Sequence, residues 1–494
     1  PSAKFHIYNG SVLFEGETGD IPISGGGTRM MWIPYKKAFR AGEAWTNEWD
    51  NSNIGNYSVA MGLGTKALGI SSIAMGQFSS ATYPTCIAMG NYAEATGTGA
   101  VAIGSDVKAQ AYSSVAIGSY NIAAGNASNW ISTDPIFVIG NGLNESNRSN
   151  AITVLKNGNT GINTDSPLCG FHVKNGSVLY EGTTGATPTS GAGTRMMWIP
   201  SKSALRAGLV TGDEWDDANI GFYSTAFGRK TISSGLQSVA MGYESTASGN
   251  SSVAMGSYTT ASGGSSVAMG SYTTASGGSS VAMGLYTTAS GGGSVAMGSY
   301  ATASGITSVA MGLYTTAQAY ASLVLGRYNL ISGTTNTWTA TEPVFVIGNG
   351  TSSTATSNAF TVNKNGNTGI SRLPATNKLE VEGAASKTTA GDWLANSDRR
   401  IKTDIFDIDN SIDLLMKLRP VKFKYTPDYI KLHPFIENKY YYNFIAQEYQ
   451  EVFPESVKGS GELLNGTNQE ILQIDTYNAQ IVTIKAVQEL VKEN

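Results

Sequence analysis

Cysteine and histidine are scarce in this sequence of 494 residues. The two cysteines, Cys86 and Cys169, are too few and too far apart for a disulfide-stabilised scaffold or a Cys/His zinc site. The three histidines, His6, His172 and His433, are isolated from one another along the chain. We therefore expect neither a metal site nor a cofactor.

Charge is sparse as well. Charged residues make up 14% of the chain, and the formal net charge is −4. Because a protein that binds nucleic acid presents a basic surface, this balance argues against a nucleic-acid partner. The sequence also contains no apolar run long enough to span a membrane, so we expect no membrane insertion.

Small residues, in contrast, are abundant and periodic. The chain holds 59 glycines, and a unit of the form Ser-Val-Ala-Met-Gly-Ser-Tyr-Thr-Thr-Ala-Ser-Gly-Gly-Ser, fourteen residues long, recurs almost unchanged over residues 252–308. Alignment on its Val gives two arrays, Val59, Ile73, Ile87, Val101 and Val115, and then Thr225, Val239, Val253, Val267, Val281, Val295, Val309 and Leu323. All thirteen copies carry a Gly three residues later. This period predicts a stacked repeat architecture.

The composition of the unit excludes a coiled coil, although fourteen residues are also two heptads. Most units hold two or more Gly, each of which costs a helix about 1 kcal/mol, and no Leu/Ile seam is present. In Val-Ala-Met-Gly the larger side chains share one face of a strand, while Ala and Gly share the other. The following Tyr-Thr-Thr-Ala is typical of a second strand. Each unit therefore predicts a two-stranded coil that stacks on the next at about 4.8 Å.

A coil this small encloses little apolar volume, which favours oligomerisation. We expect the thin face of Ala and Gly to lie against another chain. Over residues 59–121 and 225–329 the units resemble the head repeats of trimeric bacterial adhesins of the YadA type, because the Gly, a preceding small residue and the Ala eight residues after the Val recur together. The resemblance implies a mainly β, homotrimeric fibre of left-handed parallel β-roll coils.

A larger repeat frames the two arrays. Residues 27–34 return 166 positions later as residues 193–200, and residues 135–142 return 208 positions later as residues 343–350. The difference of 42 positions is three whole units, which matches eight coils in the second module against five in the first.

Near Asp392 charged residues become more frequent, which predicts a separate α+β domain. Its apolar stretches at residues 412–418 and 481–491 have helical spacing. We therefore expect seven segments: a β-rich cap of module 1 (1–56), a β-roll array of five coils (57–128), a β connector (129–166), a β-rich cap of module 2 (167–222), an array of eight coils (223–336), a second β connector (337–390) and the C-terminal domain (391–494).

This last domain contains the motif Ser397-Asp398-Arg399-Arg400-Ile401-Lys402. With residues 418–425, 444–455 and 484–490, it resembles the intramolecular chaperone, or auto-processing, domain of phage tail fibres and endosialidase tail-spikes. In that family the Ser is a nucleophile, the Lys five residues later activates it, and the bond before the Ser is broken.

The resemblance implies that Ser397 attacks the carbonyl of Asn396 with Lys402 as general base, while Asp398 and Arg400 complete the motif. We expect burial in a trimer and the cationic neighbours to favour neutral Lys402. The alternative is that the motif is a loop of a chaperone that does not cleave. In either case we expect no turnover of an external substrate.

Aromatic residues supply the candidate receptor contacts. Trp45, Trp49 and Trp215 lie beside carboxylates, which suits sugar binding, but each also precedes an array and can cap its first coil. A second candidate is the Tyr-rich segment Tyr440, Tyr441 and Tyr442. A Tyr ladder also recurs once per coil, as Tyr258, Tyr272, Tyr286, Tyr300, Tyr314 and Tyr328. The ladder either binds a polymer by stacking or is a packing stripe.

These features together predict an extracellular trimeric tail fibre of a phage or of a phage-like contractile injection particle. Its partners would be a host cell-surface glycan or protein and a baseplate or upstream fibre protein. The alternative is a bacterial cell-surface trimeric adhesin, although adhesins of the YadA type end in a membrane anchor and this sequence ends in the chaperone-like domain. A glycan-degrading tail-spike is less favoured, because Glu244 is the only acidic residue in residues 225–333.

Overall fold

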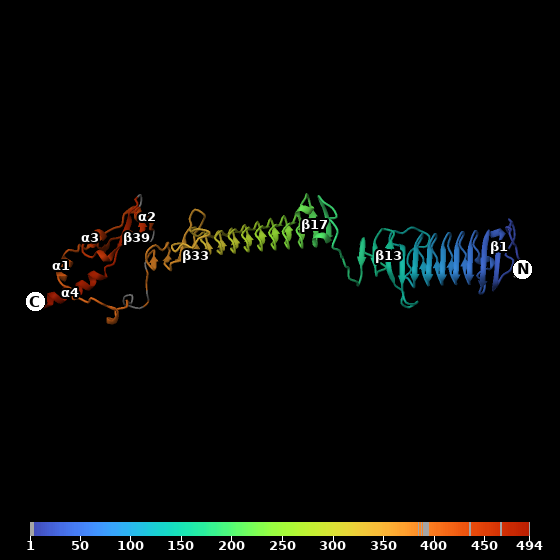
Figure 1. Cartoon of the computed structure of the whole chain (residues 1–494), viewed down its shortest axis with the longest axis horizontal. Helices are drawn as coiled ribbons and strands as arrows, with labels where there is room; N and C mark the ends of the chain where they lie inside the picture. Colours follow the sequence, from blue (N-terminus) through green and yellow to red (C-terminus); the bar gives the residue numbers. More distant parts are fainter. Residues whose placement is uncertain are drawn as a thin grey trace. The chain divides into compact units, whose positions relative to one another are not determined.

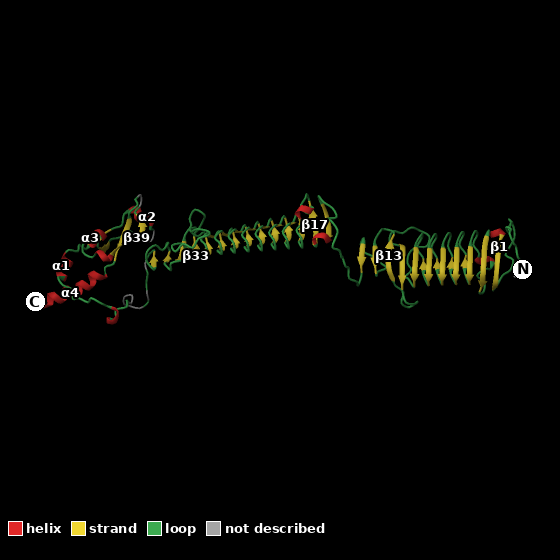
Figure 2. Cartoon of the chain, viewed as in Figure 1, coloured by secondary structure: helices red, strands yellow, loops and turns green. Residues whose placement is uncertain are grey.

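Two units make up the chain, Pro1–Tyr180 and Glu181–Asn494. The computed structural model describes residues 4–383, 385–386, 388, 395–433, 436–464 and 467–493, so the predicted domain start near Asp392 lies outside the described residues. Both units are mainly β, and the α-helices lie in the C-terminal part of the second unit (Figures 1 and 2). The predicted fold class of stacked β-coils with a C-terminal α+β region is confirmed.

Every coil except the last of each array contains a long strand of five residues and a short strand of two residues, as in β22 (Val253–Ser257) and β23 (Thr260–Ala261). The long strands of the first array are β3 (Val59–Leu63), β5 (Ile73–Gln77), β7 (Ile87–Asn91), β9 (Val101–Ser105) and β11 (Val115–Ser119), and its short strands are β4 (Lys66–Ala67), β6 (Ser80–Ala81), β8 (Glu94–Ala95) and β10 (Lys108–Ala109). The other long strands of the second array are β18 (Thr225–Arg229), β20 (Val239–Tyr243), β24 (Val267–Ser271), β26 (Val281–Leu285), β28 (Val295–Ser299), β30 (Val309–Leu313) and β32 (Leu323–Arg327). Its other short strands are β19 (Ile232–Ser233), β21 (Thr246–Ala247), β25 (Thr274–Ala275), β27 (Thr288–Ala289), β29 (Thr302–Ala303) and β31 (Thr316–Ala317).

Successive coils pair in parallel and in register, one unit apart. Ala254 lies opposite Ala268, and Met255 lies opposite Met269. The long strands belong to one sheet in each unit and the short strands to another. Because every strand hydrogen-bonds to the equivalent residues of the next coil, the fourteen-residue period of the sequence becomes the spacing of the coils.

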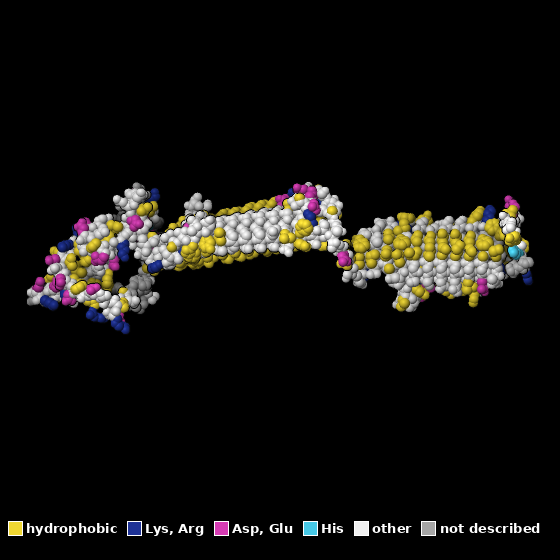
Figure 3. All heavy atoms as spheres, in the orientation of Figure 1, with side chains coloured by type: hydrophobic (Ala, Val, Ile, Leu, Met, Phe, Trp, Pro, Cys, Tyr) yellow, Lys and Arg dark blue, Asp and Glu magenta, His cyan; other side chains and the backbone are white. Residues whose placement is uncertain are grey.

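Small side chains fill the interior of each coil. The Ala after each Val, such as Ala254, is fully buried, whereas the neighbouring Val253 and Met255 are half-buried on the outer surface. The expectation that the thin face lies against another chain is therefore wrong. The coil is so narrow that Ala, Ser and Thr fill it, and the bulkier side chains point outward. Figure 3 shows apolar side chains gathered in a continuous band along the first array.

Close stacking leaves no room for a side chain at the glycine of each long strand. At Gly256 the backbone has φ +133°, and an added Cβ would lie 1.9 Å from the carbonyl oxygen of Gly270 in the next coil. We expect Gly256→Ala to cost more than the roughly 1–3 kcal/mol of backbone strain alone. Gly278→Ala is the matched control, because an added Cβ there meets nothing within 4 Å. Thermal denaturation followed by circular dichroism should show a lower midpoint for Gly256→Ala only, and equal midpoints would contradict the stacking.

A β-hairpin opens the first array. Strand β1 (Gly27–Ile33) pairs antiparallel with β2 (Ala38–Ala44), which pairs in parallel with β3. Arg40 lies opposite Ala60, at the position of the buried Ala of later coils, and donates to the carbonyls of Ser58 and Ala67, both at 3.1 Å. Burial lowers the pKa of Arg40 to about 10. Its guanidinium thus closes the end of the coil interior.

The second unit repeats this hairpin with β16 (Gly193–Ile199), β17 (Ala204–Val210) and Arg206, whose pKa burial also lowers to about 10. A connector follows each array. The connectors are β12 (Pro135–Asn141), β13 (Asn150–Leu155), β14 (Thr160–Ile162) and β15 (Phe171–Val173) in the first unit, and β33 (Pro343–Asn349), β34 (Asn358–Asn363), β35 (Thr368–Ile370) and β36 (Leu379–Val381) in the second. Short 3-10 helices lie at Pro34–Lys36, Asn51–Asn53, Pro200–Lys202, Asp217–Asn219, Arg399–Ile401 and Pro454–Ser456.

The C-terminal domain combines four α-helices and two antiparallel strand pairs among its described residues. Its elements are α1 (Ser411–Met416), β37 (Val421–Phe423), α2 (Pro427–Leu432), β38 (Tyr441–Asn443), α3 (Ala446–Gln450), β39 (Val457–Leu463), β40 (Glu470–Ile474) and α4 (Tyr477–Glu493). Strand β37 pairs with β38, and β39 pairs with β40. The two apolar stretches of helical spacing therefore coincide with α1 and α4. A core of Tyr449, Phe453, Val457, Ala479 and Val482 joins α3, β39 and α4.

Candidate self-cleavage site

Ser397 and Lys402 lie at the two ends of a tight turn. Asp398 caps the 3-10 helix Arg399–Ile401, because its Oδ1 accepts the backbone N–H of Arg400 at 2.8 Å. This single turn brings Lys402 back to Ser397, and Lys402 Nζ donates a hydrogen bond to Ser397 Oγ at 2.5 Å. The structure thus brings together the two side chains that the motif singled out.

The other motif residues hold the turn. The guanidinium of Arg400 pairs with the carboxylate of Asp398, with its terminal nitrogen 2.7 Å from Oδ2 and its Nε 3.1 Å from Oδ1. The hydrogen bonds that Arg400 donates from its side chain and its backbone lower the pKa of Asp398. Asp398 and Arg400 therefore hold the turn at whose ends Ser397 and Lys402 lie.

Asn396, Ser397 and Lys402 are all exposed in the single chain. Lys402 Nζ donates to the Ser397 hydroxyl here, whereas a general base has to accept the proton of that hydroxyl. The described part of the single chain does not supply the burial that the sequence predicts around Lys402.

Comparison with known families adds to this geometry. Residues 397–458 match the family described as chaperone of endosialidase. The matches to the YadA head domain repeat cover residues 54–79, 87–106, 220–245, 233–259, 261–287 and 289–315. The chain carries YadA head repeats and an endosialidase-type chaperone domain. The resemblances seen in the sequence are thereby confirmed.

This combination of domains indicates a homotrimeric fibre or adhesin that carries a chaperone and is exposed outside the cell. Among the described residues, the helices are too short or too polar to cross a membrane. The described part of the chain also contains no cluster of three or more His, Cys, Asp or Glu side chains placed to hold a metal ion.

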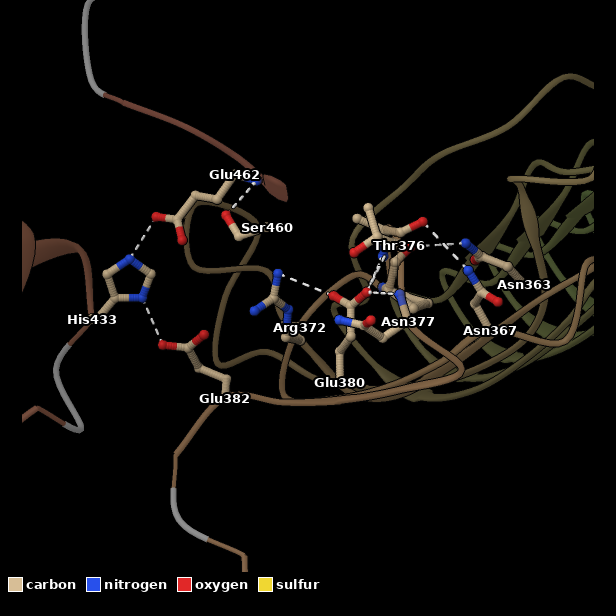
Figure 4. A network of polar contacts seen from close by, with 12 residues as sticks. Asn363, Asn367, Arg372, Thr376, Asn377, Glu380, Glu382, His433, Ser460 and Glu462 are labelled. Atoms are coloured by element: carbon tan, nitrogen blue, oxygen red, sulfur yellow. Dashed lines mark hydrogen bonds and ion pairs between the residues drawn. The ribbon is translucent and has the colours of Figure 1, made fainter. Parts of the chain in front are cut away.

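His433 of the chaperone domain lies between two carboxylates (Figure 4). Its Nδ1 is 2.6 Å from Glu382 Oε1, which follows strand β36 of the connector, and its Nε2 is 2.7 Å from Glu462 Oε1 on β39. The ring of Tyr429 packs on the imidazole with the centroids 4.3 Å apart. The imidazole therefore joins the connector to the chaperone domain, and we call the contact of Glu382, His433 and Glu462 the histidine clamp.

The connector is itself ordered where it reaches this clamp. Glu380 accepts the backbone N–H groups of Ala375, Thr376 and Asn377 at 2.7–3.0 Å and pairs with Arg372 at 3.1 Å (Figure 4). Burial alone would raise the pKa of Glu380, but these backbone hydrogen bonds lower it. The turn before β36 is therefore well fixed, and Glu382 leaves it two residues later.

The histidine clamp predicts a pH dependence. Burial alone would lower the pKa of His433, but its hydrogen bonds to Glu382 and Glu462 raise it above 6.5. The facing Tyr429 stays neutral, because burial and the two carboxylates raise its pKa to about 12. The contribution of the histidine clamp to the free energy of unfolding is thus complete below pH 6.5. It is lost as the pH rises through the raised pKa of His433. Hydrogen bonds to charged groups contribute about 1.5–3 kcal/mol each.

Hydrogen exchange of the segments around Glu382 and His433, corrected for intrinsic rates, should therefore show protection at pH 6 that weakens at pH 9. His433→Gln keeps a hydrogen-bonding side chain but cannot be protonated, so its protection should be equal at both values. Equal protection of the unchanged chain at pH 6 and pH 9 would contradict a charged clamp.

Two predicted receptor contacts are buried. Trp49 and Trp215 are 0% exposed, and their Nε1 atoms donate to the carbonyls of Thr65 and Thr231 at 2.9 and 2.8 Å. Receptor contact is therefore wrong for these two indoles, and the alternative that they cap an array holds, because each indole donates to a carbonyl of the first coil. Trp45 is 62% exposed.

The Tyr-rich segment is partly accessible. Tyr440 and Tyr442 are exposed, whereas Tyr441 is half-buried and packs against Phe423 and Tyr425. Tyr440 and Tyr442 remain candidate receptor contacts.

The Tyr ladder packs on itself. From Tyr258 to Tyr328 the ring centroids of successive coils lie 4.3–4.9 Å apart, and the rings are tilted by only 5–12°. The faces of the rings therefore cover one another, so a polymer cannot stack on them within the ladder. Their edges and hydroxyl groups still reach the surface.

Proposed function

We propose that this chain is the fibre of a phage tail or of a phage-like contractile injection particle, and that it binds a receptor on the host surface. In this proposal the chaperone domain aligns three chains and then cuts itself off before Ser397. The observation that carries the proposal is the contact of Lys402 Nζ with Ser397 Oγ in a domain of the endosialidase chaperone family. The other partners would be the baseplate or an upstream fibre protein.

The cleavage step follows from this contact. Once Lys402 is neutral, it accepts the proton of Ser397 Oγ while the oxygen attacks the carbonyl carbon of Asn396. The C–N bond then breaks, the departing nitrogen takes up the proton, and Asn396 is left joined to Ser397 through an ester. Water hydrolyses this ester, which gives a carboxylate on Asn396 and a fragment that begins with a free Ser397.

The outward faces of the long strands are the surface that three chains would share. Met61 and Ile103 on this face are 39% and 42% exposed in the single chain, and the same positions recur in every coil. The interior of the coil holds mostly Ala, so these outward side chains are the main apolar surface available for burial. Each buried aliphatic side chain contributes about 1.5–3 kcal/mol, which becomes large when it is repeated along an array.

Immunogold electron microscopy of a producing culture tests the proposed function. Antibodies against the chain should label the tails of released particles. Label confined to the surface of the bacteria would overturn the particle assignment and favour the alternative of a cell-surface adhesin. Binding of the purified chain to host cells tests the receptor role separately.

A further inference from the structure

A groove of about 300 Å³ runs beside the C-terminal end of the Tyr ladder in the second array. The ladder edges from Tyr286 to Tyr328 line it on one side, together with Thr302 and Thr316 of the short strands. Ser353 and Thr356, in the loop between β33 and β34, also line it. All the lining residues that the structure describes are uncharged. Its volume lies at the lower end of the range for small-molecule sites.

The first array holds a network of charged side chains at the equivalent place. With the displacement of 208 positions between the modules, Thr302, Thr316, Ser353, Thr356 and Tyr314 correspond to Glu94, Lys108, Glu145, Arg148 and Asp106. Five uncharged side chains thus replace five charged ones between two otherwise similar modules.

These charges contact one another in the first array. Lys108 Nζ lies 3.5 Å from Glu94 and 4.0 Å from Glu145, and Arg148 pairs with Glu145. Arg148 also donates to the carbonyl of Asp106 at 2.9 Å and lies over the ring of Tyr120, 5.6 Å from its centroid. The long guanidinium side chain therefore occupies the space beside the last Tyr, where the second array has the groove.

The ion pairs that the partly exposed Glu94 and Glu145 make contribute only about 0–1 kcal/mol each. The exchange also changes what the surface can bind. The Thr and Ser hydroxyls of the groove and the Tyr hydroxyl groups both donate and accept hydrogen bonds, and the edges of the rings add apolar surface. Sugars present the same mixture of hydroxyl groups and C–H surface. A groove without charged side chains offers nothing to attract an ionic group.

We propose that the groove beside Tyr286–Tyr328 binds an uncharged oligosaccharide, and that the first array lacks such a site because Arg148 and its ion pairs fill it. The regular spacing of 4.3–4.9 Å between the rings offers successive sugar units equivalent contacts along the ladder. This inference deepens the receptor role in the proposed function and rests on it.

A printed array of neutral and of sialylated oligosaccharides, probed with the full-length chain, tests the specificity. The strongest neutral ligand is then titrated by calorimetry. The double variant Ser353→Glu/Thr356→Arg carries the charges of the first array into the groove and should weaken binding at least tenfold. Thr351→Glu/Thr354→Arg is the matched control, because it adds the same charges to exposed residues of the same loop that do not line the groove.

The proposal is wrong if the chain binds no neutral oligosaccharide, or if the two double variants bind it with equal affinity. Loss of the trimer in the variant with the closed groove would also overturn the proposal, because the groove would then be an interface between copies of the chain. If the closing variant does not fold, Thr302→Val/Thr316→Val removes two hydroxyls at nearly constant shape and should weaken binding as well. Host-cell binding separates the two levels. If the variant with the closed groove binds cells as well as the unchanged chain does, the groove is not the receptor site, but the receptor role of the chain stands. If the unchanged chain binds no cells, the receptor role itself is wrong.

Discussion

Ser397→Ala is expected to leave the chain at full length under conditions in which the unchanged chain releases a fragment beginning at Ser397. The substitution removes the hydroxyl that lies 2.5 Å from Lys402 Nζ, and with it the nucleophile proposed to attack the Asn396 carbonyl. Intact-mass spectrometry of the purified protein measures the result. The trimer should remain, because the exposed Ser397 contributes little to the core.

Two substitutions test whether Lys402 acts as a general base or only as a hydrogen-bond donor to Ser397. Lys402→Ala should slow release by about 10²–10⁴-fold, the usual contribution of general acid–base catalysis. Lys402→Arg keeps a donor for Ser397 Oγ but cannot lose its proton, so it should fail equally. Thr403→Ala is the neighbouring control, because the Thr403 hydroxyl bonds to Asp404 instead of the pair.

If the unchanged chain stays at full length after prolonged incubation, the cleavage mechanism is wrong, and the chaperone domain stays on the fibre. Release that persists in Lys402→Arg would instead show that Lys402 is not the base.

Residues 1–396 expressed alone are expected to give aggregates or mixed oligomers instead of the trimer. Successive coils have nearly identical registers, so three chains can pair out of step by whole units, and a globular domain that assembles first sets their alignment. Size-exclusion chromatography with light scattering measures the result. The best control is the same segment produced by cleavage of the full chain, because the two samples have identical sequences and differ only in how they folded.

If residues 1–396 fold alone into the trimer obtained by cleavage, the chaperone role is wrong. A trimer that forms only when the C-terminal domain is present at synthesis, and that persists after its release, supports that role.

The repeat itself could be predicted from the sequence in detail. The fourteen-residue period, the two strands of each coil and the extra coils of the second module all follow from the positions of Val, Ala and Gly. The orientation of the strand faces could not be deduced in this way. Alternation shows that Ala254 and Met255 lie on opposite faces, but only the narrow coil decides that Ala254 is inside.

For the sites too, contacts between residues close in sequence could be predicted, whereas contacts between distant residues could not. Ser397 and Lys402 are five residues apart, and a local turn capped by Asp398 joins them, so the motif was sufficient to find the pair. The partners of His433 are 51 and 29 positions away, and no local pattern links them. The burial of Trp49 likewise depends on the carbonyl of Thr65 in the first coil, which residues near Trp49 do not reveal.

The mass of the native particle tests the central claim, a homotrimer of stacked coils, most directly. Multi-angle light scattering of the Ser397→Ala variant, which keeps the chain intact, should give three times the chain mass of 51.7 kDa. The outward apolar faces of the long strands, half-exposed in one chain, are the physical reason for this expectation. A stable, fully folded particle with the mass of one chain would contradict it.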